Sequence, residues 1–378
     1  MPVSDSRPIS VAMIGLRGIP ASYGGVERAV EELSVRLAER GHAVTVYGRK
    51  SYCDTTISHH RGVSLRYLPA IDTKHLEAAT HTAASVVDAT RRGFDVIHLH
   101  ATGPGMFSVI PRLARVPTVV TIQGLDWRRE KWGTLASAVL RMASRVSATV
   151  PSETIVVSHT LRRIFEETMG AQTTYIPNGV DTDSLEETAP VEGLEPGRFT
   201  LFLGRLVPEK GVHTLIRAFA QVDTTQRLAI AGSSSHSDDY VAELQRLAAA
   251  DERVVMLGPR YGPEKAWLLR NAGVFAQPST IEGLPLTLLE AVACGAYTVV
   301  SDIDENVEAV TSGNRHLGSI FRTGDVADLA AKVAAAIDDP DRAEQRELGS
   351  ELVEEYDWGR IASATEDVYR RVIAARNT

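Results

Sequence analysis

Two glutamates stand on either side of a Gly-Leu-Pro turn in the segment STIEGLPLTLLEAVACG, residues 279–295. Gly283 permits backbone angles that other residues avoid, and Pro285 suits the first position of a helix. The apolar residues that follow predict a helix covered on most of its surface, which Gly295 ends. The free N–H groups and the positive dipole at its start favour an anion. We therefore expect a phosphate there, with Glu290 accepting hydroxyl hydrogen bonds beside it; the alternative for Glu290 is solvation on the one wet face of the helix.

A second segment, GRLVPEKG at residues 204–211, carries two cations at the end of a predicted strand. Arg205 and Lys210 would lie at the carboxyl edge of that strand, facing the same crevice as the turn just described. A guanidinium and an ammonium in that position would neutralise a pyrophosphate without a metal. Both residues could also be ordinary surface charges.

The glycine-rich segment GLRGIPASYGGVE, residues 15–27, follows the first predicted strand. Gly24 and Gly25 stand directly before a predicted helix, where backbone without side chains can approach an anion closely. The spacing is not the GxGxxG of dinucleotide-binding proteins, and no Gly-Lys-Ser/Thr follows as in a P-loop. We interpret the segment as a phosphate-approach loop, with an ordinary flexible turn as the alternative.

Two histidines lie in the segment DVIHLHATGPG, residues 95–105. They are two positions apart, so they share one face of a strand that is apolar enough to be central and covered. His100, directly before the Gly-Pro-Gly loop, is expected to surface in a cleft, while His98 lies deeper. The alternative is that both are histidines of the core.

The segment GLDWRREKWG, residues 124–133, is a charged loop with two tryptophans. Sugars stack on indole faces and hydrogen-bond to carboxylates and guanidinium groups, so the loop suits a carbohydrate acceptor, although a structural role fits it as well. The residues that we assign to acceptor binding here are Asp126, Trp127 and Arg128. If the acceptor is lipid-linked, the surface that would meet it is expected at Arg128, Arg129 and Lys131.

Metal-binding patterns are weak in this sequence. Asp181 and Asp183 form an Asp-x-Asp pair, but their position in a turn-rich linker favours a helix cap or a turn. His59 and His60 have no third ligand in a suitable pattern. We therefore predict no metal site and no cofactor.

The length, composition and net charge of the chain predict a soluble protein. Its 378 residues suffice for two domains, and 44% hydrophobic with 23% charged residues is ordinary for a globular chain. A net charge of −8 opposes general binding of nucleic acid. Cys53 and Cys294 lack a metal-ligand spacing and indicate a reducing compartment. Since the N-terminus has no apolar signal region and no apolar run approaches about 20 residues, we expect a cytoplasmic protein, and peripheral contact with the inner face of a membrane stays open.

Apolar, β-branched runs alternate with helical patterns along the whole chain, which predicts βα units around parallel sheets. The turn-rich, acidic stretch 178–199 is expected to hold the interdomain boundary. Two halves of similar architecture place a crevice at the carboxyl edges of both sheets. The expected strands are residues 9–16, 42–48, 63–69, 95–101, 117–124, 154–158, 173–177, 200–206, 227–231, 253–257, 273–277 and 297–301, and the expected helices include residues 26–40, 212–222, 326–337 and 358–375.

Together these segments resemble the retaining family-4 glycosyltransferases of the GT-B fold, from about residue 9 to residue 358 and beyond. The motifs that carry the resemblance are GGVE at residues 24–27, His100, GRLVPEKG at residues 204–211, and Glu282 eight residues before Glu290. The segments IGLRGIPASYGGVE and GLDWRREKWG further resemble a bacterial subset of rhamnosyl- or polysaccharide-type transferases.

The resemblance implies an α/β protein with two Rossmann-like domains whose parallel sheets face each other across a cleft. Residues 1–180 would form the acceptor-binding domain and residues 181–355 the domain that binds the nucleotide-sugar donor. A terminal helix, residues 356–378, would pack back on the first domain.

The resemblance also implies a role for each motif. Arg205 and Lys210 would hold the donor diphosphate, and Glu290 the ribose hydroxyls. Glu282 and the backbone after it would contact the donor sugar and phosphate, and His100 would lie beside the reacting sugar. The further donor-binding residues would be Gly24, Gly25, Gly204, Gly258, Arg260, Gly283, Leu284, Pro285 and Leu286, and Tyr23 would join the acceptor site. Gln123 occupies a strand end where family members often have His.

The implied activity is transfer of a sugar from a UDP-, dTDP- or GDP-linked donor to a hydroxyl of a glycan, a lipid-linked saccharide or a small molecule, with retention and without metal. The resemblance implies Arg205, Lys210, Glu282 and His100 as the catalytic residues. The alternatives are a sugar-nucleotide epimerase of the same fold and a non-catalytic protein that binds nucleotide sugar or glycan. A dinucleotide-dependent oxidoreductase is opposed by the absence of GxGxxG.

Overall fold

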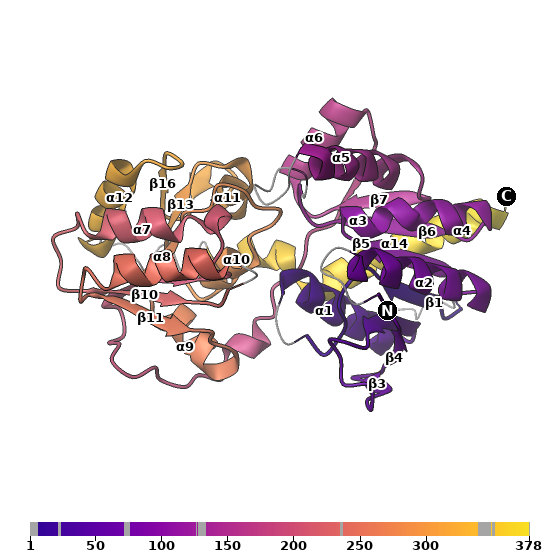
Figure 1. Ribbon diagram of the computed structural model, residues 1–378, viewed down its shortest axis with the longest axis horizontal. Helices are drawn as coiled ribbons and strands as arrows, with labels where there is room; N and C mark the ends of the chain where they lie inside the picture. The colour runs from indigo at the N-terminus through magenta and orange to yellow at the C-terminus, as the bar shows by residue number, and fades with distance from the viewer. Residues whose placement is uncertain are drawn as a thin grey trace. The chain divides into compact units, whose positions relative to one another are not determined.

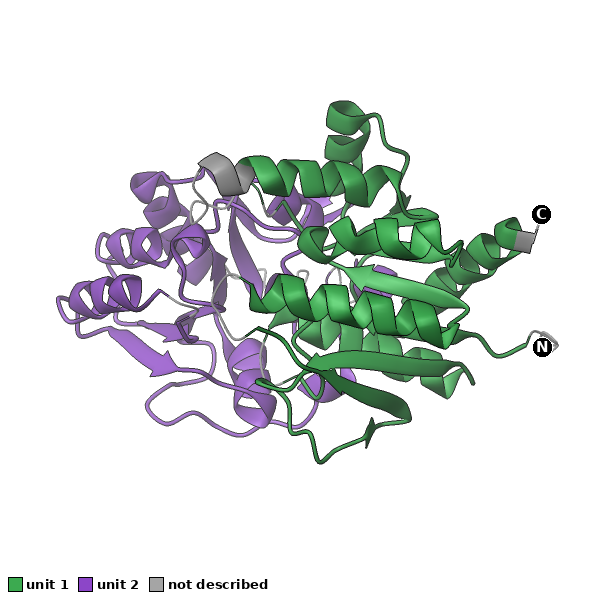
Figure 2. Cartoon of the chain, turned by 45° about the vertical axis from the view of Figure 1, so that its right-hand side comes forward, with its two compact units in different colours: residues 1–179, 358–378 green, residues 180–357 purple. Residues whose placement is uncertain are grey.

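The structure is a computed structural model that describes residues 7–21, 24–71, 76–125, 127, 134–234, 237–338, 349 and 352–377. The chain divides into two compact units, coloured green and purple in Figure 2. Unit 1 comprises residues 1–179 and 358–378, and unit 2 comprises residues 180–357. The boundaries expected at residues 180 and 355 lie close to these joints.

Unit 1 is built on an eight-stranded sheet in the order β3-β4-β2-β1-β5-β6-β7-β8 (Figure 1). Neighbouring strands are parallel except β3 and β4. All residues of β5 and β6 are buried, as expected for central strands with helices on both faces. The strands are β1 Ser10–Ile14, β2 Ala43–Arg49, β3 His59–His60, β4 Val63–Leu68, β5 Val96–His100, β6 Thr118–Ile122, β7 Glu153–Val156 and β8 Thr174–Tyr175.

Helices cover both faces of this sheet. The described helices of unit 1 are α1 Gly25–Glu39, α2 Glu77–Arg92, α3 Thr102–Gly105, the 3₁₀ turn η1 Met106–Ser108, α4 Val109–Leu113, α5 Thr134–Thr149, α6 His159–Met169 and α14 Trp358–Asn377. Helices α1 and α14 pack together in one apolar core, and α2, α3 and α5 pack on the opposite face. Local chemistry sets the ends of α6, because the Ser158 Oγ accepts a hydrogen bond from Leu161 N–H at 3.2 Å and Gly170 is left-handed.

The terminal helix α14 belongs to unit 1, in line with the packing that the resemblance implies. Trp358, Ile361 and Tyr369 are buried in the same core as Val30 of α1. The chain enters this helix beside Gly179, where a Cβ would lie 2.5 Å from Cδ2 of Trp358. A glycine is therefore required at that position for the indole ring to pack.

Unit 2 is built on a six-stranded sheet in the order β11-β10-β9-β12-β13-β16, and all of its pairs are parallel. Its core joins α7, α8 and α12 to the sheet. The strands are β9 Phe199–Leu203, β10 Arg227–Ala231, β11 Val254–Gly258, β12 Val274–Gln277, β13 Tyr297–Ser301 and β16 Ser319–Phe321, with a separate antiparallel pair, β14 Thr311–Ser312 and β15 Arg315–His316. The described helices are η3 Asp183–Leu185, η4 Pro208–Lys210, α7 Val212–Phe219, α8 Asp238–Ala248, α9 Gly262–Asn271, α10 Leu286–Ala293, α11 Asp304–Ala309, α12 Val326–Asp338 and η5 Glu354–Tyr356.

The two parallel sheets confirm the predicted fold class. The sequence analysis did not predict β3, β16 or the β14–β15 pair, since strands of two or three residues carry no periodic pattern. The Gly-Pro-Gly stretch expected to be a loop is the short helix α3. Within the described part of the chain, no helix has both the length and the apolar character needed to cross a membrane.

Replacing Trp358 by Ala should lower the free energy of unfolding by about 3–5 kcal/mol, because it removes a large buried side chain from the core of unit 1. Urea unfolding followed by circular dichroism measures this change. Arg371→Ala on the same helix is the control, since that side chain is 55% exposed, and its effect should stay within about 0.5 kcal/mol. Equal effects of the two substitutions would contradict the packing of α14 on unit 1.

Candidate functional site

The carboxyl ends of the unit 2 strands bring two predicted segments together. All strands of the sheet are parallel, so the segments that follow β9 and β12 leave the same edge. Thr280 N–H donates a hydrogen bond to the Glu209 carbonyl at 2.9 Å. Gly211 has φ 67° and lies so close to the Pro278 carbonyl that a Cβ would be 2.1 Å from its oxygen. The two turns therefore form one packed structure.

Lys210 and Glu282 form an ion pair within this structure. The Lys210 Nζ lies 2.5 Å from Glu282 Oε1, and the side chains are 17% and 8% exposed. Burial raises the pKa of Glu282, but the Lys210 ammonium and hydrogen bonds from Lys210, Ser279 and Gln277 outweigh burial and hold the pKa below its usual value. Glu282 is thus an ionised carboxylate beside an ammonium.

A buried polar network supports the turn that carries Glu282. Gln277 Nε2 donates to Glu282 Oε1 at 2.7 Å and lies 3.0 Å from Ser279 Oγ. Asn306 Nδ2 donates to Ser301 Oγ at 2.9 Å, and that hydroxyl donates to the Ser279 carbonyl at 2.5 Å. The sequence analysis missed these supporting residues. A Gln that ends a buried apolar strand was the available signal for the first of them.

Glu290 is paired with a lysine that the sequence analysis did not identify. Its Oε1 accepts a hydrogen bond from Lys265 Nζ of α9 at 2.6 Å, and the two side chains are 14% and 9% exposed. The alternative of a solvated Glu290 is therefore wrong. A buried lysine beside Ala266 and Leu268 in an apolar helix segment was the signal that could have identified this partner.

Helix α10 begins one residue later than predicted. Pro285 is the N-cap, with ψ 80°, and its carbonyl accepts from the N–H groups of Leu288 and Leu289 at 2.9 and 3.1 Å. The helical run thus starts at Leu286. Leu284 and Pro285 are buried, whereas Gly283 and Leu286 are half-buried, so the start of the helix lies at the same edge as Lys210 and Glu282.

The other predicted donor residues of unit 2 leave neighbouring strands. Arg205, after β9, is exposed. Gly204 packs against Gly232, where a Cβ would lie 1.9 Å from the Gly204 carbonyl oxygen, and Gly232 N–H donates to the Gly258 carbonyl at 2.9 Å. Arg260 Nε lies 3.4 Å from a carboxylate of α9, Glu264 Oε2. Gly232, which the sequence analysis missed, allows these backbones to approach.

The glycine-rich loop of unit 1 is held by acidic side chains of α1. Gly24 has φ 105°, and a Cβ there would lie 2.2 Å from Glu27 Oε2. Glu27 Oε1 accepts from Arg17 N–H at 3.4 Å. Gly25 is the first residue of α1, so Glu27 places a negative charge in the first turn of that helix. The approach of Gly24 and Gly25 to a donor diphosphate stays a prediction.

His98 and His100 share one face of β5, with ring centroids 4.1 Å apart. His98 Nδ1 lies 2.7 Å from Tyr369 Oη and Nε2 lies 2.7 Å from Thr121 Oγ1. Burial lowers the pKa of His100 to about 3, and burial together with the charge of His100 lowers the pKa of His98 well below its usual value. Both rings are therefore neutral at pH 7.

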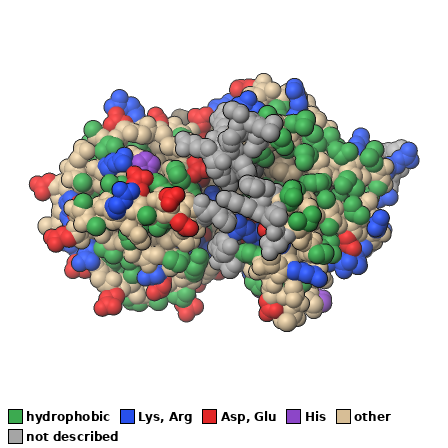
Figure 3. All heavy atoms as spheres, in the orientation of Figure 1, with side chains coloured by type: hydrophobic (Ala, Val, Ile, Leu, Met, Phe, Trp, Pro, Cys, Tyr) green, Lys and Arg blue, Asp and Glu red, His purple; other side chains and the backbone are tan. Residues whose placement is uncertain are grey.

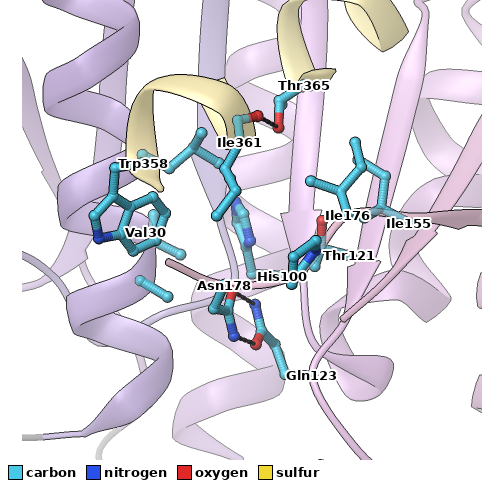
Figure 4. A pocket seen from close by; sticks show the side chains of 13 residues that line it. Val30, His100, Thr121, Gln123, Ile155, Ile176, Asn178, Trp358, Ile361 and Thr365 are labelled. Carbon is cyan, nitrogen blue, oxygen red and sulfur yellow. Dashed lines mark hydrogen bonds between the residues drawn. The ribbon is translucent and has the colours of Figure 1, made fainter. Parts of the chain in front are cut away.

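The prediction that His100 surfaces is wrong, since this residue is 1% exposed. It lines a small cavity of unit 1, shown in Figure 4, of about 20 Å³, which is room for one ordered water. Helix α1 contributes Val30 and helix α14 contributes Trp358 and Ile361, so these two helices cover the end of β5. The amides of Gln123 and Asn178 pair in the same wall, at 2.7 and 3.4 Å.

The predicted acceptor residues are only partly described. Trp127 packs edge-on against Phe165, with centroids 6.0 Å apart. The other residues of this prediction lie outside the described part of the chain: Tyr23, Asp126 and Arg128, with Arg129 and Lys131.

The side chains of the weak metal-binding patterns contact other protein groups. Asp181 Oδ1 accepts from Ser184 N–H at 3.4 Å, which is the turn role that the sequence analysis favoured. His60 Nε2 lies 2.6 Å from Glu31 Oε1. In the ranges that the structure describes, no cluster of three or more His, Cys, Asp or Glu side chains is arranged to hold a metal ion.

Lys210→Met should move the pKa of Glu282 above that of an exposed glutamate, about 4.3, because burial then acts without the opposing ammonium. In the native protein the folded-state pKa is below the unfolded one. The carboxylate therefore stabilises unit 2 above pH ~4.3, and this contribution is lost as the pH falls through the folded value. In the variant the folded-state pKa lies above the unfolded one, so the buried carboxylate destabilises unit 2 at pH 7. Acidification from pH 7 should then protonate Glu282 and raise the free energy of unfolding.

Urea unfolding at pH 7 and at about pH 5 measures this change, and Lys210→Met should gain stability relative to the native protein on acidification. The double variant Lys210→Met/Glu282→Gln is the control, because it has no carboxylate to titrate and should show no relative gain. The same pH dependence in the native protein and in Lys210→Met would contradict the pairing.

Comparison with known proteins identifies the family. A family model for glycosyl transferases group 1 matches residues 186–351, and one for Glycosyltransferase Family 4 matches residues 23–184. The phosphatidyl-myo-inositol mannosyltransferase of Mycobacterium tuberculosis is 31% identical over 370 residues, which cover 92% of this chain and 93% of that protein. The glycogen synthase of the same organism is 28% identical over 95% of this chain and 94% of its own length.

Solved structures share the fold. Sucrose-phosphate synthase from Thermosynechococcus elongatus superimposes with a TM-score of 0.80 at 22% identity, over 97% of this chain and all of that one. HepE of Anabaena, in complex with UDP and glucose, gives 0.77 at 21% identity, over 96% and 100% of the two chains. With two Rossmann-like units, matching family models over both and a full-length relative above 30% identity, the chain belongs to the group 1 glycosyltransferases of the GT-B fold.

Proposed function

We propose that this glycosyltransferase moves a sugar from a nucleoside-diphosphate donor, UDP-, dTDP- or GDP-linked, to a hydroxyl acceptor, with retention and without a metal or other cofactor. The observation that carries the proposal is the buried Lys210–Glu282 pair at the carboxyl edge of the unit 2 sheet, beside the start of α10. A cation held beside a helix start is suited to a diphosphate.

The leaving diphosphate is where negative charge develops during transfer, so fixed positive groups there lower the barrier. Lys210 is one of these positive groups, although it is paired with the Glu282 carboxylate. Arg205, which follows β9 at the same edge of the sheet, is the second cation. The start of α10 lies at the same edge, and the positive end of its helix dipole favours an anion there. These groups would hold the diphosphate without a metal.

Glu290 is the residue proposed to bind the ribose hydroxyls. The contact with Lys265 Nζ at 2.6 Å fixes the position of the Glu290 carboxyl group, whose oxygens can accept hydrogen bonds from two hydroxyls. Gly258 and Arg260 are proposed to lie near the base. Placement of His100 beside the reacting sugar stays a prediction from the resemblance.

The chemistry proposed for the transfer step is a front-face reaction. The bond between the sugar C1 and the phosphate oxygen breaks toward an oxocarbenium-like state, and the acceptor oxygen bonds to C1 from the same side. The leaving phosphate oxygen takes the proton of the acceptor hydroxyl. No side-chain nucleophile is needed, so the work of the protein is to position the donor and stabilise its diphosphate.

The names of relatives support a nucleoside-diphosphate donor in general. HepE was solved with UDP and glucose, and a starch synthase from Arabidopsis thaliana was solved with ADP and acarbose. The mycobacterial relative is named for transfer of mannose to phosphatidyl-myo-inositol. We propose a glycan, a lipid-linked saccharide or a small molecule as acceptor, with the enzyme in the cytoplasm and in peripheral contact with the membrane. A role in polysaccharide biosynthesis of the rhamnosyl type is proposed from the resemblance of residues 14–27 and 124–133 alone.

The donor site can be tested by melting temperature with UDP, dTDP, GDP, ADP and NAD in the presence of a chelator. A ligand that binds only the folded protein raises this temperature, and we expect a clear rise with one nucleoside diphosphate. Glu290→Gln and Lys210→Met should weaken its affinity about tenfold or more, or about 1.4 kcal/mol. A rise with NAD alone, or unchanged diphosphate affinity in both variants, would exclude this site.

Retention can be tested by NMR of the first product formed from an α-linked donor. The expected product has an α-glycosidic bond, because the acceptor oxygen enters on the face from which the diphosphate leaves. A β-linked first product would mean inversion and would require a general base that this proposal does not contain. Measuring early time points keeps slow anomerisation of side products from obscuring the result.

A further inference from the structure

Large apolar side chains stand exposed on α4 and α5 of unit 1. Leu113 is 82% exposed, Met142 61%, Val139 45% and Val109 41%. The spacing within each helix, four residues in α4 and three in α5, places each pair on one helix face. In Figure 3 hydrophobic side chains gather on unit 1 over α3, α4 and α5. Soluble monomers seldom expose such clusters without a function.

The two helices belong to one part of unit 1. Helix α5 packs along α3 and η1, and that segment continues directly into α4. Figures 1 and 2 show α5 beside this segment. The exposed apolar residues of the two helices can therefore act together.

Arginines accompany these apolar side chains. Arg112 lies in the last turn of α4 and Arg115 follows that helix, while Arg141 and Arg145 lie one turn apart on α5; all four are exposed. None of them forms an ion pair with another residue of the described ranges. Residues 96–125 and 134–152 contain no Asp or Glu, although the whole chain has a net charge of −8. All charged side chains of these two segments are therefore arginines, whereas the whole protein is acidic.

We propose that this basic-apolar face, formed by Val109, Arg112, Leu113, Arg115, Val139, Arg141, Met142 and Arg145, docks on an anionic lipid bilayer. Apolar side chains can enter the boundary between headgroups and acyl chains while flanking arginines contact lipid phosphates. A second copy of the chain would fit less well. Contact between two identical faces would bring arginines against arginines.

This inference rests on the proposed function, because docking on a bilayer would bring the enzyme to a lipid-linked acceptor. Binding to the bilayer itself needs neither donor nor acceptor. Failure to bind vesicles is therefore distinguishable from failure of the transfer reaction.

The test is co-sedimentation of the full chain with vesicles of phosphatidylglycerol and phosphatidylcholine, 1:1, and with vesicles of phosphatidylcholine alone. We expect binding to the anionic vesicles that weakens at high salt. Leu113→Gln/Met142→Gln should lower the partition coefficient about tenfold or more. Arg112→Gln/Arg145→Gln should lower it about fivefold per charge removed.

Matched variants on unit 2 are the controls: Tyr261→Gln for an apolar residue, which is 52% exposed, and Arg217→Gln/Arg246→Gln for two exposed cations. They should leave partitioning within about twofold, and the melting temperature of every variant should match that of the native protein. No binding to anionic vesicles, or equal losses in face and control variants, would overturn the proposal. Concentration-dependent dimerisation that Leu113→Gln/Met142→Gln abolishes, without vesicle binding, would assign the face to a second copy instead.

Discussion

The pairing of the Lys210 ammonium with the Glu282 carboxylate constrains the arrangement of the candidate site in unit 2. An ionised carboxylate that is 8% exposed costs several kcal/mol unless a cation and hydrogen bonds satisfy it. The turns after β9 and β12 must therefore touch. Gly211 provides the close approach to Pro278, and the hydrogen bond from Thr280 N–H to the Glu209 carbonyl fixes the register.

A second buried pair repeats this arrangement on neighbouring helices. Lys265 of α9 holds Glu290 of α10, so the carboxylate proposed for the ribose is fixed before a ligand arrives. Groups held in advance cost no rearrangement when charge develops, which is the condition for electrostatic stabilisation of a leaving diphosphate. Removing one partner of either pair would leave a buried charge uncompensated, at about 3–5 kcal/mol.

Site residues that lie within short sequence motifs were predicted from the sequence, whereas the side chains that pair with them from distant parts of the chain were mostly missed. The sequence placed Lys210 and Glu282 at one edge of a sheet, because each follows a parallel strand whose end is recognisable, and the structure brings the two together there. Lys265 was missed, since it is 25 residues from Glu290 and only the packing of two helices joins them. The prediction that His100 is exposed was wrong for a similar reason. A helix from the far end of the chain, which begins at Trp358, covers this residue. Alternating strand and helix patterns sufficed to predict both sheets, but strands of two or three residues are too short to show such a pattern.

The central claim is that Lys210 recognises the donor through its diphosphate. Isothermal titration with chelator present can compare the nucleoside diphosphate that the enzyme binds with the corresponding monophosphate, in the native protein and in Lys210→Met. The account predicts that the native protein prefers the diphosphate and that the variant loses about tenfold or more of this preference, with a smaller loss for the monophosphate. An unchanged ratio of the two affinities in the variant would contradict it, since the ammonium would then make no contact that depends on the second phosphate.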